Sequence, residues 1–184
     1  MYVLLRGLYR ELMAKRIMRD LFTRMMMGLK IPCVYMHDGL LYPIHWLGSK
    51  TILWRLLRLG KGEVVVDCGA YIGRLSIKAA RSVGVEGKVI SIEPDPETFR
   101  ILLKNISLNN VADRVIPINV ALSDDEGPVK LYLTGYPATH SIVWKRDSFI
   151  EVPARKLDNL AEELKLNTIH WLIIDAEGAE VRRS

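Results

Sequence analysis

VVVDCGAYIG, residues 64–73, combines an apolar run with an acid, Asp67, and two glycines, Gly69 and Gly73. Three consecutive valines indicate a buried strand, but a strand that only fills a core needs neither a terminal carboxylate nor a flexible backbone after it. In an open α/β sheet, ligands bind beyond the carboxyl ends of the strands. Glycine lets the chain turn there and lets the next helix begin close to the ligand. We therefore interpret these residues as a strand that ends in a ligand-binding turn.

The residues after this turn alternate between apolar strands and amphipathic helices. Strands are predicted at 63–67, 88–92 and 114–119, with helices at about 73–82 and 96–109 between them. There follow β-rich segments at 128–134 and 149–153, a helix near 157–165 and a fourth strand in HWLIID, residues 170–175. Continuous apolar strands separated by helices are typical of a parallel sheet covered on both faces. The sequence therefore predicts an α/β fold with an open parallel sheet and helices on both faces.

The first sixty residues differ from this pattern, and we predict a boundary between an N-terminal extension, 1–60, and a domain, 61–184. Residues 1–30 favour two short helices, or one that turns as it packs, and charges interrupt them too often for a transmembrane span or a signal peptide. KIPCVYMHDGLLYPI, residues 30–44, predicts a hairpin, and SKTILWRLLRLG, residues 49–60, predicts a helix. The N-terminal helices either cap the domain or touch anionic lipid as a peripheral, basic surface.

The composition is that of a globular protein with one domain and an appendage, since 49% of the residues are hydrophobic and 26% are charged. Much of the net charge of +5 comes from the first thirty residues, which favours a solvated basic face over a nucleic-acid groove. Cys33 and Cys68 form no CxxC pair, which excludes a disulfide scaffold and a cysteine-rich zinc site and favours a reducing, cytoplasmic location. The absence of Gln beside many Arg, Lys and Glu residues favours a thermophilic source.

The glycine spacing argues against a dinucleotide ligand. A dinucleotide fingerprint needs glycines at relative positions 0, 2 and 5, so that the backbone can approach a pyrophosphate. Counting from Gly69, the second of these positions holds Tyr71, whose phenol ring would occupy the space of the pyrophosphate. An acid two residues before the first glycine, with glycines four residues apart, suits a ligand that has a charged amino-acid head and no phosphate.

A second acid follows the next strand. KVISIEPDPETF, residues 88–99, places Glu93 about twenty residues after the glycine turn, where an acid accepts both hydroxyls of a ribose. The two oxygens of a carboxylate accept two parallel hydrogen bonds from a diol. The alternative is that Glu93 only belongs to the start of the next helix, because PDPE is typical of such a start. The acid and glycines upstream favour the binding role.

Four blocks of the chain carry a family resemblance. They are VVVDCGAYIG at 64–73, SIEPDPETFRILLKNISLNN at 91–110, RVIPINVALSDDEG at 114–127 and WLIIDAEGAE at 171–180. Together, over about residues 62–181, they resemble the FkbM family of S-adenosylmethionine-dependent methyltransferases. The resemblance implies the Rossmann-like fold of class I methyltransferases, an open sheet of normally seven strands whose last pair is antiparallel, and S-adenosylmethionine as the cofactor.

The resemblance also implies roles for the residues at matching positions. The methionine end of the cofactor would contact the glycine turn, at Asp67, Gly69, Ala70, Tyr71 and Gly73. Tyr71 stands where the family usually has Asn. The ribose would contact Glu93, with Pro94 beside it, and the adenine would contact Asn119, Val120 and Ala121. Asp175 and Glu177 would follow the fourth strand, close to the methyl group that is transferred.

Methyl transfer from a sulfonium is an in-line displacement, so the protein acts mainly by positioning the two reactants. A hydroxyl nucleophile also benefits from a base within reach. The candidates for this base are Asp175, Glu177 and His140. Asp175 also suits an N-cap or a cofactor ligand, and His140 could be a loop residue without a role. The other histidines show no metal-ligand spacing, so no metal site is predicted.

The last residues, AEGAEVRRS at 176–184, stand where the family pattern continues with a helix, a fifth strand and an antiparallel pair. We therefore expect the C-terminal strands to be missing or replaced. The fourth strand would then be an exposed edge, for which WLIID is unusually apolar. Three explanations stay open: the sequence is truncated, a second copy covers the edge in a homodimer, or the first sixty residues fold over it.

The leading functional hypothesis is an S-adenosylmethionine-dependent methyltransferase (EC 2.1.1 type) that methylates a hydroxyl of a sugar or natural product. The first alternative is a cofactor-binding remnant or assembly subunit without catalysis, because substrate loops of this fold follow the later strands. The second alternative is a nucleic-acid methyltransferase, which only the basic charge suggests. Because the Lys and Arg residues form no aromatic-lined basic groove, we predict a small-molecule or glycan substrate rather than a nucleic acid.

Overall fold

The computed structural model describes residues 33–36, 41–43, 58–135, 137–143 and 145–175. The chain divides into two compact units, Met1–Leu56 and Leu57–Ser184. The helices predicted within 1–30, and most of the helix predicted at 49–60, lie outside the described residues. No helix in the described part of the chain is long and apolar enough to cross a membrane.

The N-terminal unit contains the predicted hairpin. Strand β1 (Cys33–Tyr35) pairs in antiparallel register with β2 (Leu41–Pro43), and Val34 lies opposite Tyr42. Cys33 and Val34 are buried. The two strands confirm the prediction made from residues 30–44, and the residues at the tip of the hairpin lie outside the described part.

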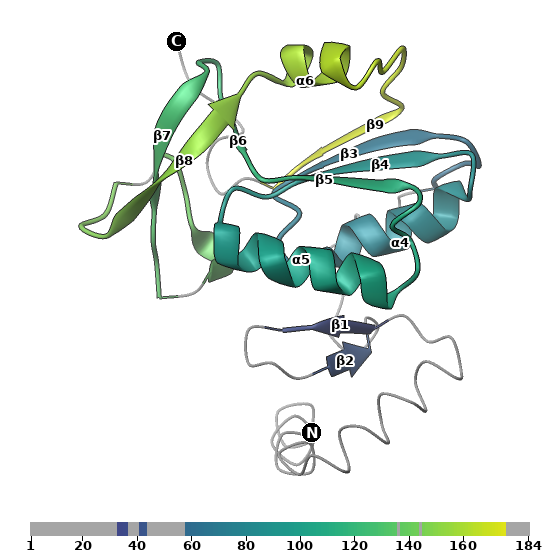
Figure 1. Cartoon of the computed structure of the whole chain (residues 1–184), viewed down its shortest axis with the longest axis horizontal. Helices are drawn as coiled ribbons and strands as arrows, with labels where there is room; N and C mark the ends of the chain where they lie inside the picture. The colour runs from purple at the N-terminus through teal and green to yellow at the C-terminus, as the bar shows by residue number, and fades with distance from the viewer. Residues whose placement is uncertain (1–32, 37–40, 44–57, 136, 144, 176–184) are drawn as a thin grey trace. The chain divides into compact units, whose positions relative to one another are not determined.

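The second unit is built on a parallel sheet of four strands (Figure 1). They are β3 (Val64–Cys68), β4 (Lys88–Ile92), β5 (Val115–Ile118) and β9 (Trp171–Ile174). Their order in the sheet is β5-β4-β3-β9, and every neighbouring pair is parallel. The chain therefore adds two strands on one side of β3 and returns to the other side with β9. Such a reversal of strand order is where open α/β sheets bind ligands.

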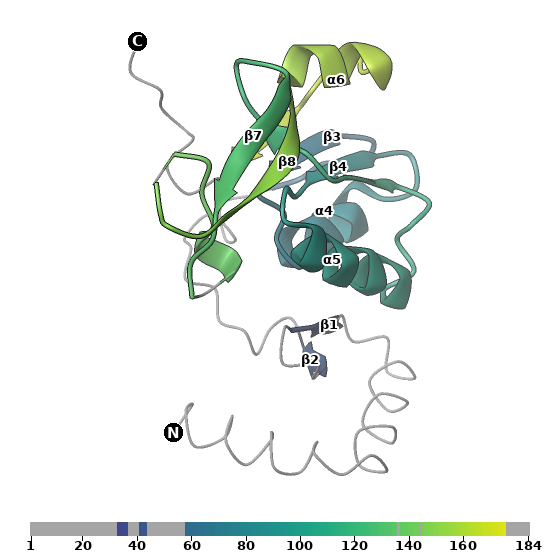
Figure 2. The same cartoon turned by 60° about the vertical axis from the view of Figure 1, so that its left-hand side comes forward.

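Helices cover both faces of this sheet, as the sequence predicts. Helices α4 (Arg74–Val83) and α5 (Pro96–Leu108) lie on one face, and α6 (Leu157–Glu163) lies on the other (Figure 1 and Figure 2). The face toward α6 carries Val66, Cys68, Ile90 and Ile92, which form one apolar cluster with Leu160 of α6. The structure thus confirms the α/β architecture with helices on both faces.

The start of α5 follows from its sequence. Asp95 is the N-cap residue, and its carboxylate accepts hydrogen bonds from the backbone N–H groups of Glu97 (3.2 Å) and Thr98 (3.3 Å). The Thr98 hydroxyl donates to the same carboxylate (2.5 Å). Pro96 occupies the first helical position, where the missing N–H costs nothing. With this cap, α5 begins four residues after the end of β4, so Glu93 lies in the short connection between the two elements.

A second, three-stranded sheet stands at one end of the main sheet (Figure 1 and Figure 2). It contains β6 (Ala121–Leu122), β7 (Gly127–Tyr132) and β8 (Phe149–Arg155), in the order β6-β8-β7. The antiparallel pair β7 and β8, with the residues between them, is called the arm, 127–155. The three-stranded sheet has a core of its own, formed by Ala121 of β6 together with Leu131, Val152 and Ala154 of the arm. The sequence predicted the β structure of the arm but not the parallel pairing of β6 with β8.

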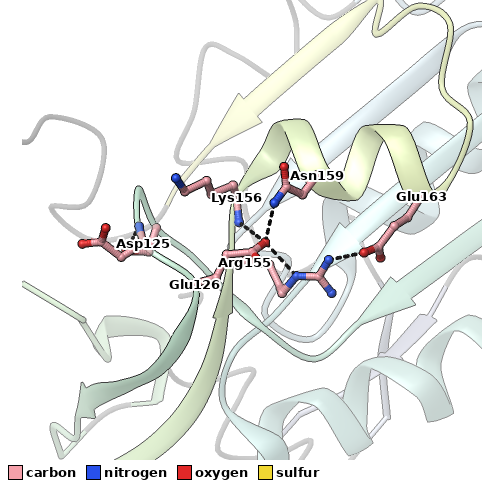
Figure 3. A network of polar contacts seen from close by, with 7 residues as sticks. Asp125, Glu126, Arg155, Lys156, Asn159 and Glu163 are labelled. Atoms are coloured by element: carbon pink, nitrogen blue, oxygen red, sulfur yellow. Dashed lines mark hydrogen bonds and ion pairs between the residues drawn. The ribbon is translucent and has the colours of Figure 1, made fainter.

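A polar network joins the base of the arm to α6, as Figure 3 shows. One oxygen of Glu126 accepts hydrogen bonds from Arg155 Nε (3.0 Å), Asn159 Nδ2 (2.9 Å) and the Lys156 backbone N–H (3.4 Å). Arg155 also pairs with Glu163. These ion pairs are solvated and each adds little to stability, but together they connect the end of β8 and the start of β7 to α6.

Strand β9 is the edge of the main sheet in the described part of the chain. It pairs with β3 on one side, and Leu172 and Ile174 are 47% and 46% exposed. The strand is therefore as apolar and as open as the sequence predicted for the fourth strand. The three explanations for its apolar edge, including the homodimer, stay predictions.

Candidate functional site

One pocket lies beyond the carboxyl ends of the strands, at the reversal of strand order. The turn after β3 contributes Cys68, Gly69 and Tyr71 to its wall, and the end of β4 contributes Glu93 and Pro94. These five residues include four of the residues that the family resemblance assigns to the cofactor. Residues far apart in the sequence therefore meet at the predicted position.

The rest of the wall comes from the end of β5, from the arm and from the end of β9. Val120, Ala121 and Leu122 form an apolar side of the pocket. The arm contributes four further residues, which are Leu131, Pro137, His140 and Ile142. Asp175 follows β9 directly and completes the wall. Two of the three predicted catalytic candidates, Asp175 and His140, thus line the pocket, whereas Glu177 lies outside the described residues.

The glycine turn is fastened to its neighbours by backbone and side-chain hydrogen bonds. Gly69 has a φ of 83°, which favours glycine, and the N–H groups of Gly69 and Ala70 both donate to the Ile92 carbonyl (2.9 Å each). From the other side, the buried Asn105 of α5 donates its amide N–H to the Ile72 carbonyl (2.8 Å). The turn is therefore held between β4 and α5 and presents a defined surface to a ligand.

Gly73 closes the turn and begins α4. Its φ is 85°, and a Cβ at this position would lie 2.5 Å from Leu102 Cδ1. Leu102 is fully buried in α5, so it has little room to move. The second glycine of the turn is therefore required both by its backbone conformation and by the close approach of α5.

Tyr71 adopts a conformation that is unusual for its residue type. Its φ is 52°, in the left-handed region, where Asn is more common than Tyr. Its backbone N–H donates to Glu93 Oε2 (2.8 Å), which holds the residue in place. A strained conformation of this kind costs on the order of 1–3 kcal/mol and is typical of functional turns. A backbone in the left-handed region suits the Asn that the family usually has at this position. In this chain the residue is Tyr71, which lines the pocket.

Glu93 is 7% exposed and links two loops of the site. Its Oε1 accepts a hydrogen bond from the Asp95 backbone N–H (3.0 Å), and its Oε2 accepts one from Tyr71. A carboxylate has about four acceptor positions, so each oxygen retains one for a diol. Burial raises the pKa of Glu93 to about 7, although the two backbone N–H groups lower it. The ribose contact stays a prediction, and the geometry is compatible with it.

Asp67 lies behind the turn rather than on the pocket wall. Its side chain is 2% exposed, and its Oδ2 accepts a hydrogen bond from the Ser76 hydroxyl of α4 (2.5 Å). Burial raises the pKa of Asp67 to about 6; the hydrogen bond from Ser76 lowers it and the charge of Asp175 raises it further. The direct contact of Asp67 with the cofactor stays a prediction. Sequence reasoning missed Ser76, whose only signal is a hydroxyl on the buried face of a helix.

Asn119 was expected to contact the adenine, and the structure turns its amide toward the backbone. Its Nδ2 donates to the carbonyls of Glu93 (2.7 Å) and Pro94 (3.0 Å), so it fastens the end of β5 to the end of β4. Val120 and Ala121, which were expected to flank the adenine as well, do lie on the pocket wall. The apolar pair therefore faces the ligand space, and Asn119 orders the strand ends beside it.

Acidic side chains dominate the electrostatics of the strand ends. The negative charges of Asp67 and Asp95 add to the raised pKa of Glu93, and Asp175 adds to that of Asp67. Such repulsion is relieved when a cation enters the site. The described residues contain no cluster of three His, Cys, Asp or Glu side chains that could hold a metal ion.

Comparison with known proteins agrees with this geometry. A model of the methyltransferase FkbM domain matches residues 67–182. The chain is 41% identical over 95 residues to a tRNA(Phe) (4-demethylwyosine(37)-C(7)) aminocarboxypropyltransferase of Pyrococcus horikoshii, a match that covers 50% of this chain and 34% of the relative. It is 42% identical over 60 residues to a probable cobalt-precorrin-6B C(15)-methyltransferase (decarboxylating) of Pyrobaculum aerophilum, which covers 33% of this chain and 31% of the relative.

Among solved structures, the chain is similar to P. horikoshii TYW2 in complex with MeSAdo, with 28% identity, a TM-score of 0.36, and coverage of 56% of this chain and 47% of that one. The chain spans about a third of the length of the curated relatives it matches. The family match begins at the acid of the glycine turn and includes more than half of the chain. The chain therefore belongs to the FkbM methyltransferase domain family, whose cofactor is S-adenosylmethionine.

Proposed function

We propose that this chain is an S-adenosylmethionine-dependent methyltransferase that transfers a methyl group to a hydroxyl of a small molecule or glycan. The observation that carries the proposal is the pocket at the reversal of strand order, which Glu93, Asp175 and His140 all line. The bound cofactor supplies the methyl group on a sulfonium. The residues of the chain bind the cofactor, orient the acceptor and take up its proton.

The pocket suits this cofactor in three ways. The free acceptor positions of Glu93 match a ribose diol. Val120 and Ala121 offer an apolar surface for a flat base. The acidic side chains around the turn favour a ligand that carries positive charge and no phosphate. All three features come from residues of the family match.

The acceptor side of the pocket would be formed by the arm and by the end of β9. Leu131, Pro137 and Ile142 give an apolar wall, and His140 and Asp175 give two groups that accept protons. A hydroxyl placed between such groups loses its proton as it attacks, which typically accelerates a reaction by about 10²–10⁴-fold. We therefore assign the role of base to Asp175 or His140 in this proposal. Glu177 stays a candidate on sequence grounds alone.

Cofactor binding is tested by titrating the full-length protein with S-adenosylhomocysteine in a calorimeter. The Glu93→Gln variant should bind at least about tenfold more weakly, because the amide cannot accept two hydrogen bonds from a diol and one from Tyr71. The matched control is Glu97→Gln, four residues further along the chain, where the side chain is 80% exposed. Equal affinities of the two variants would contradict the role of Glu93, and a wild-type protein that fails to bind would contradict the proposed function.

Methyl transfer is tested by incubating the protein with methyl-labelled cofactor and a panel of glycans, small hydroxylated metabolites and RNA. Label in the hydroxylated small molecules or glycans supports the proposal. Label in RNA alone would favour the nucleic-acid alternative, which the similarity to the tRNA(Phe) aminocarboxypropyltransferase of P. horikoshii supports. Cofactor binding without any transfer would favour the alternative of a non-catalytic remnant or assembly subunit.

A further inference from the structure

We infer that Ser76 is a positioning residue that keeps the carboxylate of Asp67 ionised and oriented behind the glycine turn, so that cofactor affinity at neutral pH depends on its hydroxyl. The inference rests on the proposed function, because it concerns the same cofactor site. Ser76 does not touch the ligand space. It acts through Asp67, the acid that ends the strand from which the turn begins.

The contact between the two side chains is short and fully enclosed. Ser76 Oγ lies 2.5 Å from Asp67 Oδ2, and the two side chains are 0% and 2% exposed. The Ser76 backbone N–H also acts on the Asp67 carboxylate. Ser76 is the third residue of α4, where the free N–H groups of a helix start favour a negative charge. Ser76 thus donates its hydroxyl to a buried carboxylate.

The surroundings of Asp67 otherwise oppose its ionisation. Burial is the largest cause that raises its pKa, to about 6, and the charge of Asp175 after β9 raises it as well. Burial raises the pKa of Glu93 at the end of β4 to about 7, and the charge of Asp67 contributes to this rise. Burial also raises the pKa of the Cys68 thiol, next to Asp67, to about 12. Arg74 begins the same helix as Ser76. Among these groups the Ser76 hydroxyl is the strongest influence that lowers the pKa.

Removal of this hydroxyl should therefore move the ionisation of Asp67 upward through neutral pH. Hydrogen bonds to charged groups are strong enough to shift a pKa by about one unit or more. At pH 7 the wild-type carboxyl is mostly ionised and attracts a cationic cofactor from behind the turn. Without the hydroxyl, a pKa raised by about one unit leaves about half of the same carboxyl protonated at pH 7, and part of this attraction is lost.

The test is the pH dependence of S-adenosylmethionine binding to the full-length protein between pH 5.5 and 9, measured as Kd for wild type and Ser76→Ala. We expect the midpoint at which affinity falls toward acid pH to move upward by about one unit in Ser76→Ala. The variant should then bind about twofold more weakly at pH 7, about fivefold more weakly at pH 6 and nearly as well as wild type at pH 9. Ser76→Thr keeps the hydroxyl and should retain the wild-type midpoint.

Two controls separate this effect from damage to the helix and from the titration of Glu93. Ser82→Ala deletes a hydroxyl near the other end of α4 and should leave the profile unchanged. Asp67→Asn should remove the part of the pH dependence of Kd that Ser76→Ala shifts, while the part that is due to Glu93 remains. A Ser76→Ala profile that keeps the wild-type midpoint, or an affinity loss that is equal at every pH, would overturn the inference and leave the proposed function standing. Failure of wild type to bind at any pH would overturn both.

Discussion

Replacing Gly73 with alanine should disable the turn on which the cofactor site is built. Gly73 has a φ of 85°, and an L residue with a Cβ loses about 1–2 kcal/mol in this region. The added Cβ would also lie 2.5 Å from Leu102 Cδ1, and overpacking of a buried side chain typically costs about 1–3 kcal/mol. Together these effects should lower the free energy of unfolding by about 2–5 kcal/mol, a large part of the stability of a small domain.

The matched control is Gly62→Ala in the same unit. Gly62 has a φ of 78°, and nothing lies within 4 Å of the position where its Cβ would be. This variant therefore measures the backbone cost alone, about 1–2 kcal/mol. Urea unfolding followed by circular dichroism should give a larger loss for Gly73→Ala than for Gly62→Ala. Adding Leu102→Val to Gly73→Ala should recover part of the difference.

Cofactor affinity extends the comparison from stability to function. Under conditions where both variants are folded, Gly73→Ala should weaken the binding of S-adenosylhomocysteine, because the turn from Gly69 to Gly73 must shift away from α5. Gly62→Ala should bind like wild type, since Gly62 lies before β3 and outside the pocket wall. Equal destabilisation of both variants together with unchanged binding would refute the reasoning, because the approach of α5 would then not constrain the turn.

Three further predictions concern the groups that hold the strand ends. Asn105→Leu should lower the free energy of unfolding by about 1–3 kcal/mol in urea, because it leaves the Ile72 carbonyl without its donor. Asn119→Asp should lower it more than Asn119→Ala, since a carboxylate would face two carbonyl oxygens; the reverse order would contradict the assigned orientation. The raised pKa values of Asp67 and Glu93 mean that the folded state binds protons more tightly, so their stabilising contribution is full below about pH 4 and lost as pH rises through about 6 to 7. Urea unfolding at pH 5 and pH 8 should show this slope, and an Asp67→Asn, Glu93→Gln double variant should lack it.

Much of the fold could be predicted because its causes are local. Alternation of apolar runs with helical segments placed β3, β4 and β5 within one or two residues of their observed ends. The PDPE sequence indicated the start of α5, and Asp95 caps it as such residues do. The acid at the end of β3 and the two glycines indicated a turn, and Gly69 and Gly73 have φ values of 83° and 85° in that turn.

The roles within the site were predicted less completely. Asn119 was expected at the adenine, which stays a prediction, and the two hydrogen bonds that its amide donates to backbone carbonyls were not foreseen. Ser76 and Asn105 were not predicted as site residues, because a polar residue in a helix gives no signal of its own in the sequence. Only the packing of the helices brings their side chains to Asp67 and to the Ile72 carbonyl. The arm was predicted as β structure with one candidate site residue, His140, and the contribution of Leu131 and Ile142 to the pocket could not be anticipated.

The sequence by itself determined where the strands lie along the chain, the glycine turn and the family, because hydrophobic periodicity, backbone freedom and motif spacing are properties of neighbouring residues. Only the tertiary structure decided which polar atoms face the ligand space and which support it from behind. Asp67 and Ser76 are nine residues apart, and Asn119 and Glu93 are twenty-six apart. Their contacts depend on the direction of each side chain after the helices have packed on the sheet, and no local pattern encodes that direction.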